Sequence, residues 1–255
     1  MDYLPSDFLQ KMKTLLKEES EAFFATYKQE KTSGLRINPL KVSFEQWEEI
    51  SPFAMNKIPF VENGYYYRRE DAPGKHPYHA AGLYYIQEPS AMFVAEQLEL
   101  SEGDMVLDLC AAPGGKTTAI GARLGNEGVL LSNEISAKRV KALSENVERF
   151  GLTNTAVINE TPENLSAQFE ECFDKIIVDA PCSGEGMFRK DPESCQYWSG
   201  DYVESCHHLQ LEILSHAYAM LKKGGILLYS TCTFSPEENE QTIEQFVKTF
   251  PDMEI

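Results

Sequence analysis

Long hydrophobic runs are missing from this 255-residue sequence. No apolar stretch approaches the roughly 18 to 20 residues that a membrane-spanning helix needs. The first residues also lack the apolar segment of a signal peptide, because Asp2, Asp7 and Lys11 are spread among them. These absences predict a soluble, cytoplasmic protein with no membrane partner.

Paired cysteines are missing as well, although the sequence contains six cysteines. No two of them form a Cys-x-x-Cys pair, so neither a zinc ribbon nor a small secreted disulfide framework is indicated. His207 and His208 adjoin Cys206 on a predicted helix, but neighbours in sequence point apart and do not make a metal site. We therefore predict no metal, while chemistry at individual thiols remains open.

Positive charge is scarce: 23 Lys and Arg residues stand against 40 Asp and Glu residues, giving a net charge of −17. Such an acidic chain argues at first against a polyanionic partner. The first 80 residues, however, hold 11 basic and 12 acidic side chains, a balance of −1. The rest of the chain holds 12 and 28, a balance of −16, so most of the acidity belongs to the second part.

What the sequence does contain, beyond about residue 82, is an alternation of apolar runs with amphipathic segments. This alternation is typical of an α/β fold with a parallel sheet covered by helices on both faces. The predicted strands are residues 105–110, 128–132, 155–158, 175–179 and 226–230. A helix of about 20 residues, ending at Gly224, is predicted between the last two.

Local signals predict where other helices begin and end. Ser136 is the predicted N-cap of one helix, and Gly151 is the predicted stop of the same helix. For the last helix, Ser235 is the predicted cap, Pro236 the first helical residue and Glu238 the partner in a capping box.

The N-terminal part has a different pattern. Residues 5 to about 31 carry apolar side chains at helical spacing, and residues 34–67 mix short apolar runs with Pro and Gly, which predicts a small α+β unit. Residues 71–82 are typical of a linker. We therefore predict two domains, residues 1–80 and residues 81–255.

The segment from Asp108 to Lys116 reads Asp-Leu-Cys-Ala-Ala-Pro-Gly-Gly-Lys. It follows the first strand of the predicted parallel sheet and opens a helix, which is where open α/β sheets bind ligands. The spacing matches neither a dinucleotide fingerprint nor a P-loop. Glu134 ends the next strand and is placed to accept hydrogen bonds from ribose hydroxyls, and a site at or near Glu160 would suit an adenine edge. These features favour a nucleoside cofactor without a diphosphate, namely S-adenosylmethionine.

Two further motifs place cysteines at strand ends: Asp179-Ala-Pro-Cys-Ser-Gly184 and Ser230-Thr-Cys-Thr233. Together with the segment from Asp108 to Lys116, called the cofactor loop, they resemble the RNA 5-methylcytosine methyltransferases of the NOL1/NOP2/Sun type, and among them the bacterial 16S ribosomal RNA enzymes of the F type. The resemblance runs from about residue 34 to 250. It implies a Rossmann-like class I methyltransferase sheet in the catalytic domain, preceded by a small α+β N-terminal domain.

The resemblance implies chemical roles for the motif residues. Cytosine C5 is too weak a nucleophile to be methylated unaided, so a thiolate first adds to C6, and the resemblance assigns this step to Cys232. It assigns Cys182 to assisting the release of the C5 proton and Asp179 to a hydrogen bond on the N3 side. A reactive cysteine needs an electropositive setting, for which Lys190 is a catalytic candidate, although Arg189 and Lys190 fit solvated loop charges equally well.

The resemblance also implies which residues bind the cofactor. Those around its methionine part are Cys110, Ala111, Ala112, Pro113, Gly114, Gly115 and Lys116. Glu134 is expected at the ribose, where relatives often have Asp, while Arg139 supports the site and Asp179 also borders it. The adenine position has no clean counterpart, and Asn159 or Glu160 could substitute.

The implied function is S-adenosylmethionine-dependent methylation of cytosine C5 in RNA by a monomer, with 16S ribosomal RNA or the small ribosomal subunit as partner. Transfer RNA is the alternative substrate, and a non-catalytic RNA-binding ribosome-assembly factor is the alternative class of protein. Residues 1–80 are expected to contact RNA, with Arg36, Arg68 and Arg69 as possible contacts. Because relatives usually continue into a C-terminal RNA-binding region, the catalytic domain is expected to be truncated before its last strands.

Overall fold

In the computed structural model, which describes residues 3–125 and 127–255, the chain divides into two compact units. One comprises Thr32–Asp179 and His216–Tyr229 and is called the sheet unit. The other comprises Met1–Lys31, Ala180–Ser215 and Ser230–Ile255 and is called the cysteine unit, because it contains Cys182 and Cys232. The expected boundary at residue 80 does not coincide with this division and stays a prediction about domains.

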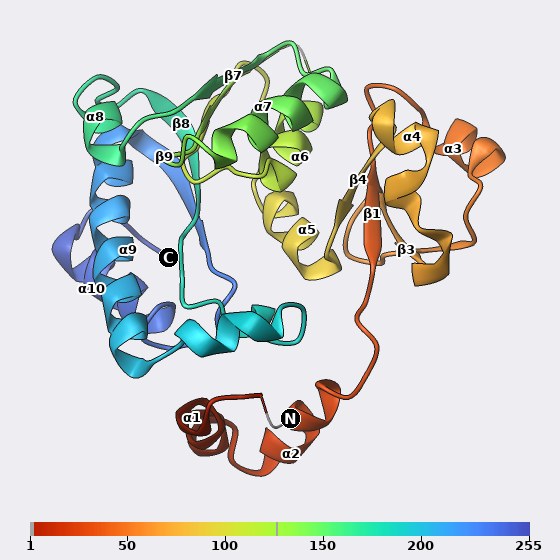
Figure 1. The fold of residues 1–255 in the computed structure, drawn as a ribbon. Helices are drawn as coiled ribbons and strands as arrows, with labels where there is room; N and C mark the ends of the chain where they lie inside the picture. The colour runs from red at the N-terminus through yellow and green to blue at the C-terminus, as the bar shows by residue number, and fades with distance from the viewer. Residues whose placement is uncertain (1–2, 126) are drawn as a thin grey trace. The chain divides into compact units, whose positions relative to one another are not determined.

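The core of the sheet unit is a five-stranded sheet with the order β7-β6-β5-β8-β9 (Figure 1). The strands are β5 (Met105–Asp108), β6 (Val129–Asn133), β7 (Thr155–Ile158), β8 (Phe173–Asp179) and β9 (Leu221–Ser230). β5 pairs in parallel with both β6 and β8, and β6 pairs in parallel with β7. The strand order reverses at β5, so the loop after β5 lies at the switch point where such sheets bind ligands.

Burial explains why these segments form strands. Val106, Leu107, Ile176 and Ile177 are fully buried, as expected for strands covered on both faces. Flanking helices supply that cover; in this unit they are α5 (Pro89–Glu96), α6 (Gly115–Leu124), α7 (Arg139–Phe150) and α8 (Pro162–Ser166). The predicted α/β fold class is confirmed, and all five predicted strands are present, although β9 begins five residues earlier than expected.

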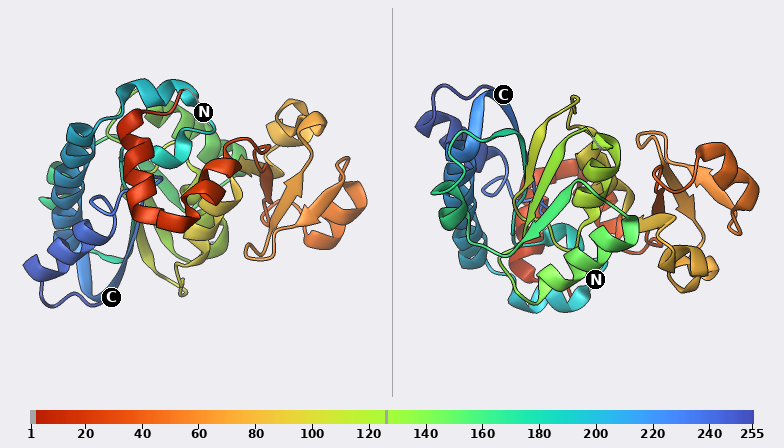
Figure 2. Two further views of the ribbon diagram at one scale, coloured as in Figure 1. Left: turned by 90° about the horizontal axis from the view of Figure 1, so that it is seen from below. Right: turned by 90° about the horizontal axis from the view of Figure 1, so that it is seen from above.

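A second sheet in the same unit is antiparallel and has the order β2-β3-β1-β4. Figure 2 shows this α+β module in orange from two sides. Its elements are β1 (Gly34–Ile37), α3 (Phe44–Ile50), β2 (Met55–Lys57), β3 (Gly64–Tyr67), α4 (Pro77–Ala80) and β4 (Tyr84–Gln87). The predicted linker at 71–82 is wrong, because short 3-10 helices and α4 occupy most of it.

The α+β module is attached to the end of α7. The Asn38 side-chain amide donates to the carbonyls of Gly82 and Phe150, at 2.9 Å each. Lys41 Nζ donates to the carbonyl of Arg149 at 2.6 Å. A Cβ at Gly82 would lie 1.9 Å from that same carbonyl oxygen, so only glycine permits this approach. The module and the five-stranded sheet therefore belong to one unit.

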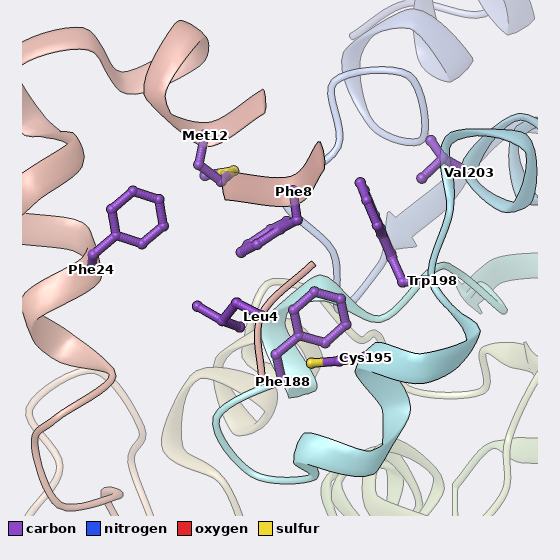
Figure 3. Close-up of a cluster of buried hydrophobic side chains, with 8 residues drawn as sticks. All are labelled: Leu4, Phe8, Met12, Phe24, Phe188, Cys195, Trp198 and Val203. Carbon is purple, nitrogen blue, oxygen red and sulfur yellow. The ribbon is translucent and has the colours of Figure 1, made fainter. Parts of the chain in front are cut away.

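The cysteine unit is built around a cluster of buried apolar side chains (Figure 3). The cluster comprises Leu4, Phe8, Met12, Phe24, Phe188, Cys195, Trp198 and Val203. The Phe8 ring meets those of Phe188 and Trp198 edge to face, at centroid distances of 5.0 and 5.8 Å. The helices of this unit are α1 (Ser6–Leu16), α2 (Ser20–Thr26), α10 (Glu240–Thr249) and most of α9 (Gly200–Met220). Within the described residues, no helix is long and apolar enough to cross a bilayer.

Four helix boundaries differ from expectation. The single helix predicted over residues 5–31 is broken at Lys17, which has φ +49°, and ends at Thr26. α7 begins at Arg139, although Gly151 stops it as predicted with φ +76°. α9 ends at Met220, and Gly224 lies within β9. α10 begins at Glu240 with no side-chain cap, so the predicted capping box is wrong.

Candidate functional site

The loop after β5 turns sharply before α6 begins. Gly114 has φ +108°, and a Cβ at this position would lie 3.2 Å from Leu143 Cδ1. The Thr118 hydroxyl donates to the carbonyl of Gly114 at 2.7 Å and fixes the first turn of the helix. Because the first N–H groups of a helix have no partner within the helix, this connection presents donors to a ligand. Residues 110–116 thus form the tight strand-to-helix connection that the sequence predicts.

Asp108 lies fully buried at the end of β5. Its Oδ2 accepts a hydrogen bond from the Thr117 hydroxyl at 2.7 Å, whereas Oδ1 has no hydrogen-bond partner among the described residues. Burial raises the pKa of Asp108 to about 7, although the Thr117 hydrogen bond and the nearby Lys116 charge oppose this rise. A buried carboxyl beneath the loop therefore titrates near neutral pH.

Glu134 and Arg139 hold the other side of the loop. The Glu134 carboxylate is buried at the end of β6, accepts a hydrogen bond from the Ser136 backbone N–H at 2.8 Å and pairs with Arg139 Nη1 at 3.3 Å. Arg139 Nη2 donates to the carbonyl of Ala112 at 2.6 Å. Since a carboxylate has about four acceptor positions, Glu134 retains capacity for ribose hydroxyls. The structure brings these two predicted residues together with the loop.

The candidates for the adenine position are engaged within the protein. The Asn159 amide donates to the carbonyls of Glu134 and Ile135, at 2.6 and 3.0 Å. The Glu160 carboxylate accepts from the Asn164 amide at 2.8 Å. These contacts make Asn159 a support for the loop that carries Glu134, and the adenine assignment stays a prediction.

Lys116 and Asp179 form an ion pair, with 2.6 Å between Nζ and Oδ2. Lys116 comes from the first turn of α6 and Asp179 from the end of β8, so neighbouring strands of the sheet bring them together. The Lys116 side chain is 10% exposed and that of Asp179 is 36% exposed. The lysine predicted to bind cofactor therefore also neutralises a carboxylate predicted to act in catalysis.

Arg36 of β1 is buried and contacts the same loop. Its Nη2 donates to the Gly115 carbonyl at 3.0 Å and to the Thr118 hydroxyl at 2.8 Å. The guanidinium lies 5.8 Å from the Tyr85 ring centroid and 5.6 Å from that of Phe150. Burial lowers the pKa of Arg36 to about 10. The expected contact of Arg36 with RNA is wrong, because the side chain supports the cofactor loop from inside the protein.

The two motif cysteines meet in the cysteine unit. Cys182 Sγ lies 3.2 Å from Cys232 Sγ and accepts a hydrogen bond from the Cys232 backbone N–H at 3.3 Å. Cys232 is exposed, whereas Cys182 is partly buried. The hydrogen bond with Cys232 raises the pKa of Cys182, and burial adds to this rise. Cys182 therefore keeps its proton and Cys232 is the accessible member of the pair.

Two fully buried glutamates hold the loops that carry these cysteines. Glu238 accepts hydrogen bonds from the Ser183 backbone N–H and hydroxyl and from Gln210 Nε2. Glu185 accepts from the Phe234 backbone N–H at 3.1 Å. Each glutamate follows one cysteine in sequence and binds the backbone next to the other. Together they fix the relative position of the two loops.

The charge of Glu185 is balanced by Lys11 of α1. Lys11 Nζ lies 3.3 Å from Glu185 Oε1 and 2.9 Å from Glu237 Oε2. It also donates to the Ser235 hydroxyl at 2.6 Å, while Trp198 Nε1 donates to Glu185 at 3.1 Å. Because an unpaired buried carboxylate is strongly destabilising, the N-terminal helix supports the Cys232 loop.

The remaining thiols and Lys190 have other surroundings. Burial raises the pKa of Cys110, and the carboxylates of Asp108, Glu134 and Asp179 raise it further, so this thiol stays protonated. Lys190 is exposed, and its carbonyl accepts a hydrogen bond from Lys31 Nζ at 2.8 Å. The raised pKa of Cys182 has its causes in Cys232 and in burial. A catalytic role for Lys190 stays a prediction.

Sequence reasoning missed the supports of the site: Lys11, Arg36, Asn133, Glu185 and Glu238. Asn133 links three strand ends, because its amide donates to the carbonyls of Leu109 and Glu160 at 3.2 and 3.0 Å. In sequence, these residues look like ordinary surface charges or caps. The available signal for Asn133, Glu185 and Glu238 was their position close to predicted site residues: Asn133 before Glu134, Glu185 after Cys182 and Glu238 after Cys232.

Two family descriptions match this chain. Residues 95–255 match "16S rRNA methyltransferase RsmB/F", and residues 4–89 match "N-terminal domain of 16S rRNA methyltransferase RsmF". A curated relative, ribosomal RNA small subunit methyltransferase F of Vibrio vulnificus, is 38% identical over 98% of this chain and 55% of its own length. The chain thus spans about half the length of the curated relatives that it matches.

Solved structures share the fold. A methyltransferase homologue from Pyrococcus horikoshii is 30% identical, with a TM-score of 0.80 over 91% of this chain and 74% of its own. NSun6 from Pyrococcus horikoshii, described with SFG, has a TM-score of 0.86 over 97% of this chain and 88% of its own. At 21% identity, the second likeness concerns the fold alone.

Proposed function

The chain belongs to the 16S rRNA methyltransferase RsmB/F family, and we propose that it methylates C5 of a cytosine in 16S ribosomal RNA through a covalent adduct. The observation that carries this proposal is the pair of thiols, Cys182 and Cys232, with 3.2 Å between their sulfur atoms. A methyltransferase that modifies an accessible nitrogen or oxygen has no need of such a pair. Cytosine C5 does, because the ring must first be activated.

S-adenosylmethionine is the cofactor, and the residues of the sheet unit fit it. The connection at Gly114 and Gly115 allows close approach to the backbone, and the start of α6 offers N–H donors. The Glu134 carboxylate suits the ribose hydroxyls, and Arg139 together with Asn159 keeps it in place. When bound, the cofactor supplies a methyl group on a positively charged sulfur.

Cys232 forms the covalent bond to the substrate. Its thiolate adds to cytosine C6, so that C5 gains electron density and can accept the methyl group. The C5 proton must then leave before the bond between sulfur and C6 can break. Cys182 takes that proton as a thiolate. The hydrogen bond with Cys232 and burial raise the pKa of Cys182, so this thiol starts protonated. Once the Cys232 sulfur is bonded to C6, the hydrogen bond no longer opposes ionisation, and Cys182 gives its own proton to solvent before it takes the C5 proton.

Asp179 and Lys116 are assigned to the N3 side of the base. Charge builds on the cytosine ring as C6 is attacked, and a proton shared between Asp179 and N3 neutralises it. Lys116, at 2.6 Å from Asp179 Oδ2, orients the carboxyl group. The two residues are therefore assigned to substrate activation, and the cysteines to bond formation and proton removal.

Nucleoside mass spectrometry tests the proposal. The protein is incubated with S-adenosylmethionine and 16S ribosomal RNA from cells that lack the gene, with transfer RNA as a parallel substrate. We expect 5-methylcytosine in the ribosomal RNA alone. Methylation of transfer RNA alone would contradict the substrate, and binding of RNA without 5-methylcytosine in either sample would favour an assembly factor. Monomeric state and cytoplasmic location stay predictions.

A further inference from the structure

We propose that a surface of aromatic and basic side chains near Cys232, with Phe234, Lys31 and Lys190 exposed and the others half-buried, binds the single-stranded nucleotides that flank the target cytosine. This inference rests on the proposed RNA substrate and identifies where part of that RNA is held. The surface lies within the cysteine unit and is called the stacking patch. It comprises Phe23, Tyr27, Lys31, Arg189, Lys190 and Phe234.

Phe234 supplies an aromatic side chain from the loop that carries Cys232. It follows Cys232 by two residues and is 42% exposed, although large apolar side chains are normally buried. Its backbone is fixed by the hydrogen bond to Glu185. A Cβ at Gly186 would lie 3.7 Å from Phe234 Cζ and 2.8 Å from the Cys232 carbonyl oxygen, so this glycine lets both residues approach. The end of the Phe234 ring and the Cys232 carbonyl oxygen therefore both lie close to Gly186.

Aromatic rings of α2 and the residue after it extend this face. The Phe23 ring meets that of Phe234 edge to face, with 5.4 Å between centroids and an interplanar angle of 88°. Tyr27 stands 5.5 Å from Phe23 in the same kind of contact. Phe23 and Tyr27 both pack on the buried cluster, whose members Phe24 and Phe188 are drawn in Figure 3. The rings thus form a supported surface, which is what stacking of successive bases requires.

Positive charges border the rings. Arg189 Nη1 donates to the Thr26 carbonyl at 3.2 Å, and Lys31 Nζ donates to the Lys190 carbonyl at 2.8 Å. Within residues 3–125 and 127–255, neither these two nor Lys190 forms an ion pair. In a chain of net charge −17, three positive charges without carboxylate partners on one surface favour an anionic partner at this place.

The combination identifies the partner. Rings alone would suit an apolar peptide, and cations alone would suit any polyanion. Stacking faces bordered by unpaired cations are what single-stranded nucleic acid needs, because bases stack and phosphates pair. The carboxylate beneath does not oppose this, since Glu185 is buried and paired with Lys11. An acidic protein can therefore bind RNA locally despite its overall charge.

Fluorescence anisotropy with a labelled single-stranded RNA of about 15 nucleotides tests the patch. Phe234→Ala and Phe234→Leu should each weaken binding roughly tenfold, because leucine keeps the apolar bulk but not the stacking face. Phe234→Trp should retain the affinity. The matched control is Phe93→Ala, since Phe93 is also 42% exposed and meets Phe60 edge to face at 5.8 Å. Equal binding by wild type and Phe234→Leu would overturn the proposal.

The charges are tested by salt dependence. In a combined Lys31→Gln, Arg189→Gln and Lys190→Gln variant, the slope of log affinity against log salt should fall by about 0.7 for each phosphate that no longer pairs with a cation. Lys75→Gln, which removes an exposed cation of the α+β module, should leave the slope unchanged. An unchanged slope in the combined variant, or an equal change in both, would overturn the role of the cations.

Failure of this inference is distinct from failure of the proposed function. If wild type makes 5-methylcytosine while the patch variants bind RNA unchanged, the patch is wrong and the function stands. If the variants lose affinity while wild type makes no 5-methylcytosine, the patch stands and the methylation proposal fails. Competition by an acidic peptide as strong as that by RNA would show a protein partner and overturn the inference.

Discussion

Glu238 accepts hydrogen bonds from both the backbone N–H and the hydroxyl of Ser183, the residue directly after Cys182. Glu238 itself lies six residues after Cys232 in sequence. One buried carboxylate therefore ties the segment of one motif cysteine to that of the other. Glu185 makes the reciprocal connection to Phe234. Buried hydrogen bonds within the cysteine unit thus set the distance between the thiols.

Glu238→Gln should separate the two thiols. Glutamine replaces one acceptor oxygen by an NH₂ group, so it cannot accept all the hydrogen bonds from Ser183 and Gln210 that the carboxylate accepts. We expect a lower kcat and a decrease of about 1–3 kcal/mol in the free energy of unfolding. The pH profile of alkylation of Cys182 should shift to lower pH, because contact with Cys232 raises the pKa of that thiol.

The control for this variant is Glu244→Gln, which changes an exposed glutamate of α10 that pairs with Lys248. It should alter neither kcat nor the alkylation profile. An alkylation profile in Glu238→Gln identical to that of wild type would show that Glu238 does not position the thiols.

Arg36→Met should weaken cofactor binding without affecting the thiols. Methionine fills much of the buried space but cannot donate to the Gly115 carbonyl or the Thr118 hydroxyl, so the start of α6 loses its support. Removing hydrogen bonds from a charged donor costs about 1.5–3 kcal/mol, which corresponds to a roughly tenfold or greater decrease in affinity for S-adenosylmethionine. Isothermal titration calorimetry measures this affinity. Arg68→Met, at an exposed arginine of the same module, is the control, and equal affinities in all three proteins would refute this role.

Asp108 should make stability fall as pH rises. Its pKa is about 7 in the folded protein and near 3.9 when unfolded, so between these values the folded state binds more protons. The free energy of unfolding therefore decreases from about pH 4 to about pH 7, by at most a few kcal/mol, and is constant beyond. Asp108→Asn keeps the acceptor for Thr117 and removes the titration.

Denaturant unfolding of wild type and Asp108→Asn at several pH values measures this difference. The variant should gain stability relative to wild type as pH rises from about 4 to about 7, with no further gain above that range. A difference that stays constant from about pH 4 to about pH 8 would show that the Asp108 carboxyl does not titrate in this range.

Much of the fold could be predicted from the sequence, because the spacing of apolar residues and the residues that begin and end helices and strands act locally. The unbroken apolar run Ile176, Ile177, Val178 is typical of a strand buried on both faces, and all three residues are buried in β8. Gly151 ends α7 as predicted. Ser235 and Glu238 show where such reasoning fails. Their spacing fits a capping box, but Ser235 Oγ donates to Glu185 and Glu238 binds Ser183, so α10 begins later. Tertiary hydrogen bonds took precedence over the local signal.

Only part of the candidate site could likewise be predicted from the sequence. Motif positions pointed to the cofactor loop, the two cysteines and Asp179, because the types of these residues follow from the proposed chemistry. Arg36 and Lys11 could not be found from local pattern, since their partners lie far away in sequence, at Gly115 and Glu185. Buried supports of this kind follow from three-dimensional packing alone.

The covalent step is tested most directly by trapping. Cys182→Ala and Cys232→Ala are each incubated with 16S ribosomal RNA and S-adenosylmethionine, and protein–RNA adducts are separated on a denaturing gel. Cys172→Ala, which removes a thiol outside both motifs, controls for general effects. We predict that Cys182→Ala accumulates an adduct that cannot resolve, whereas Cys232→Ala forms none. An adduct with Cys232→Ala but not with Cys182→Ala would reverse the two roles, and no adduct with either variant would contradict the covalent mechanism.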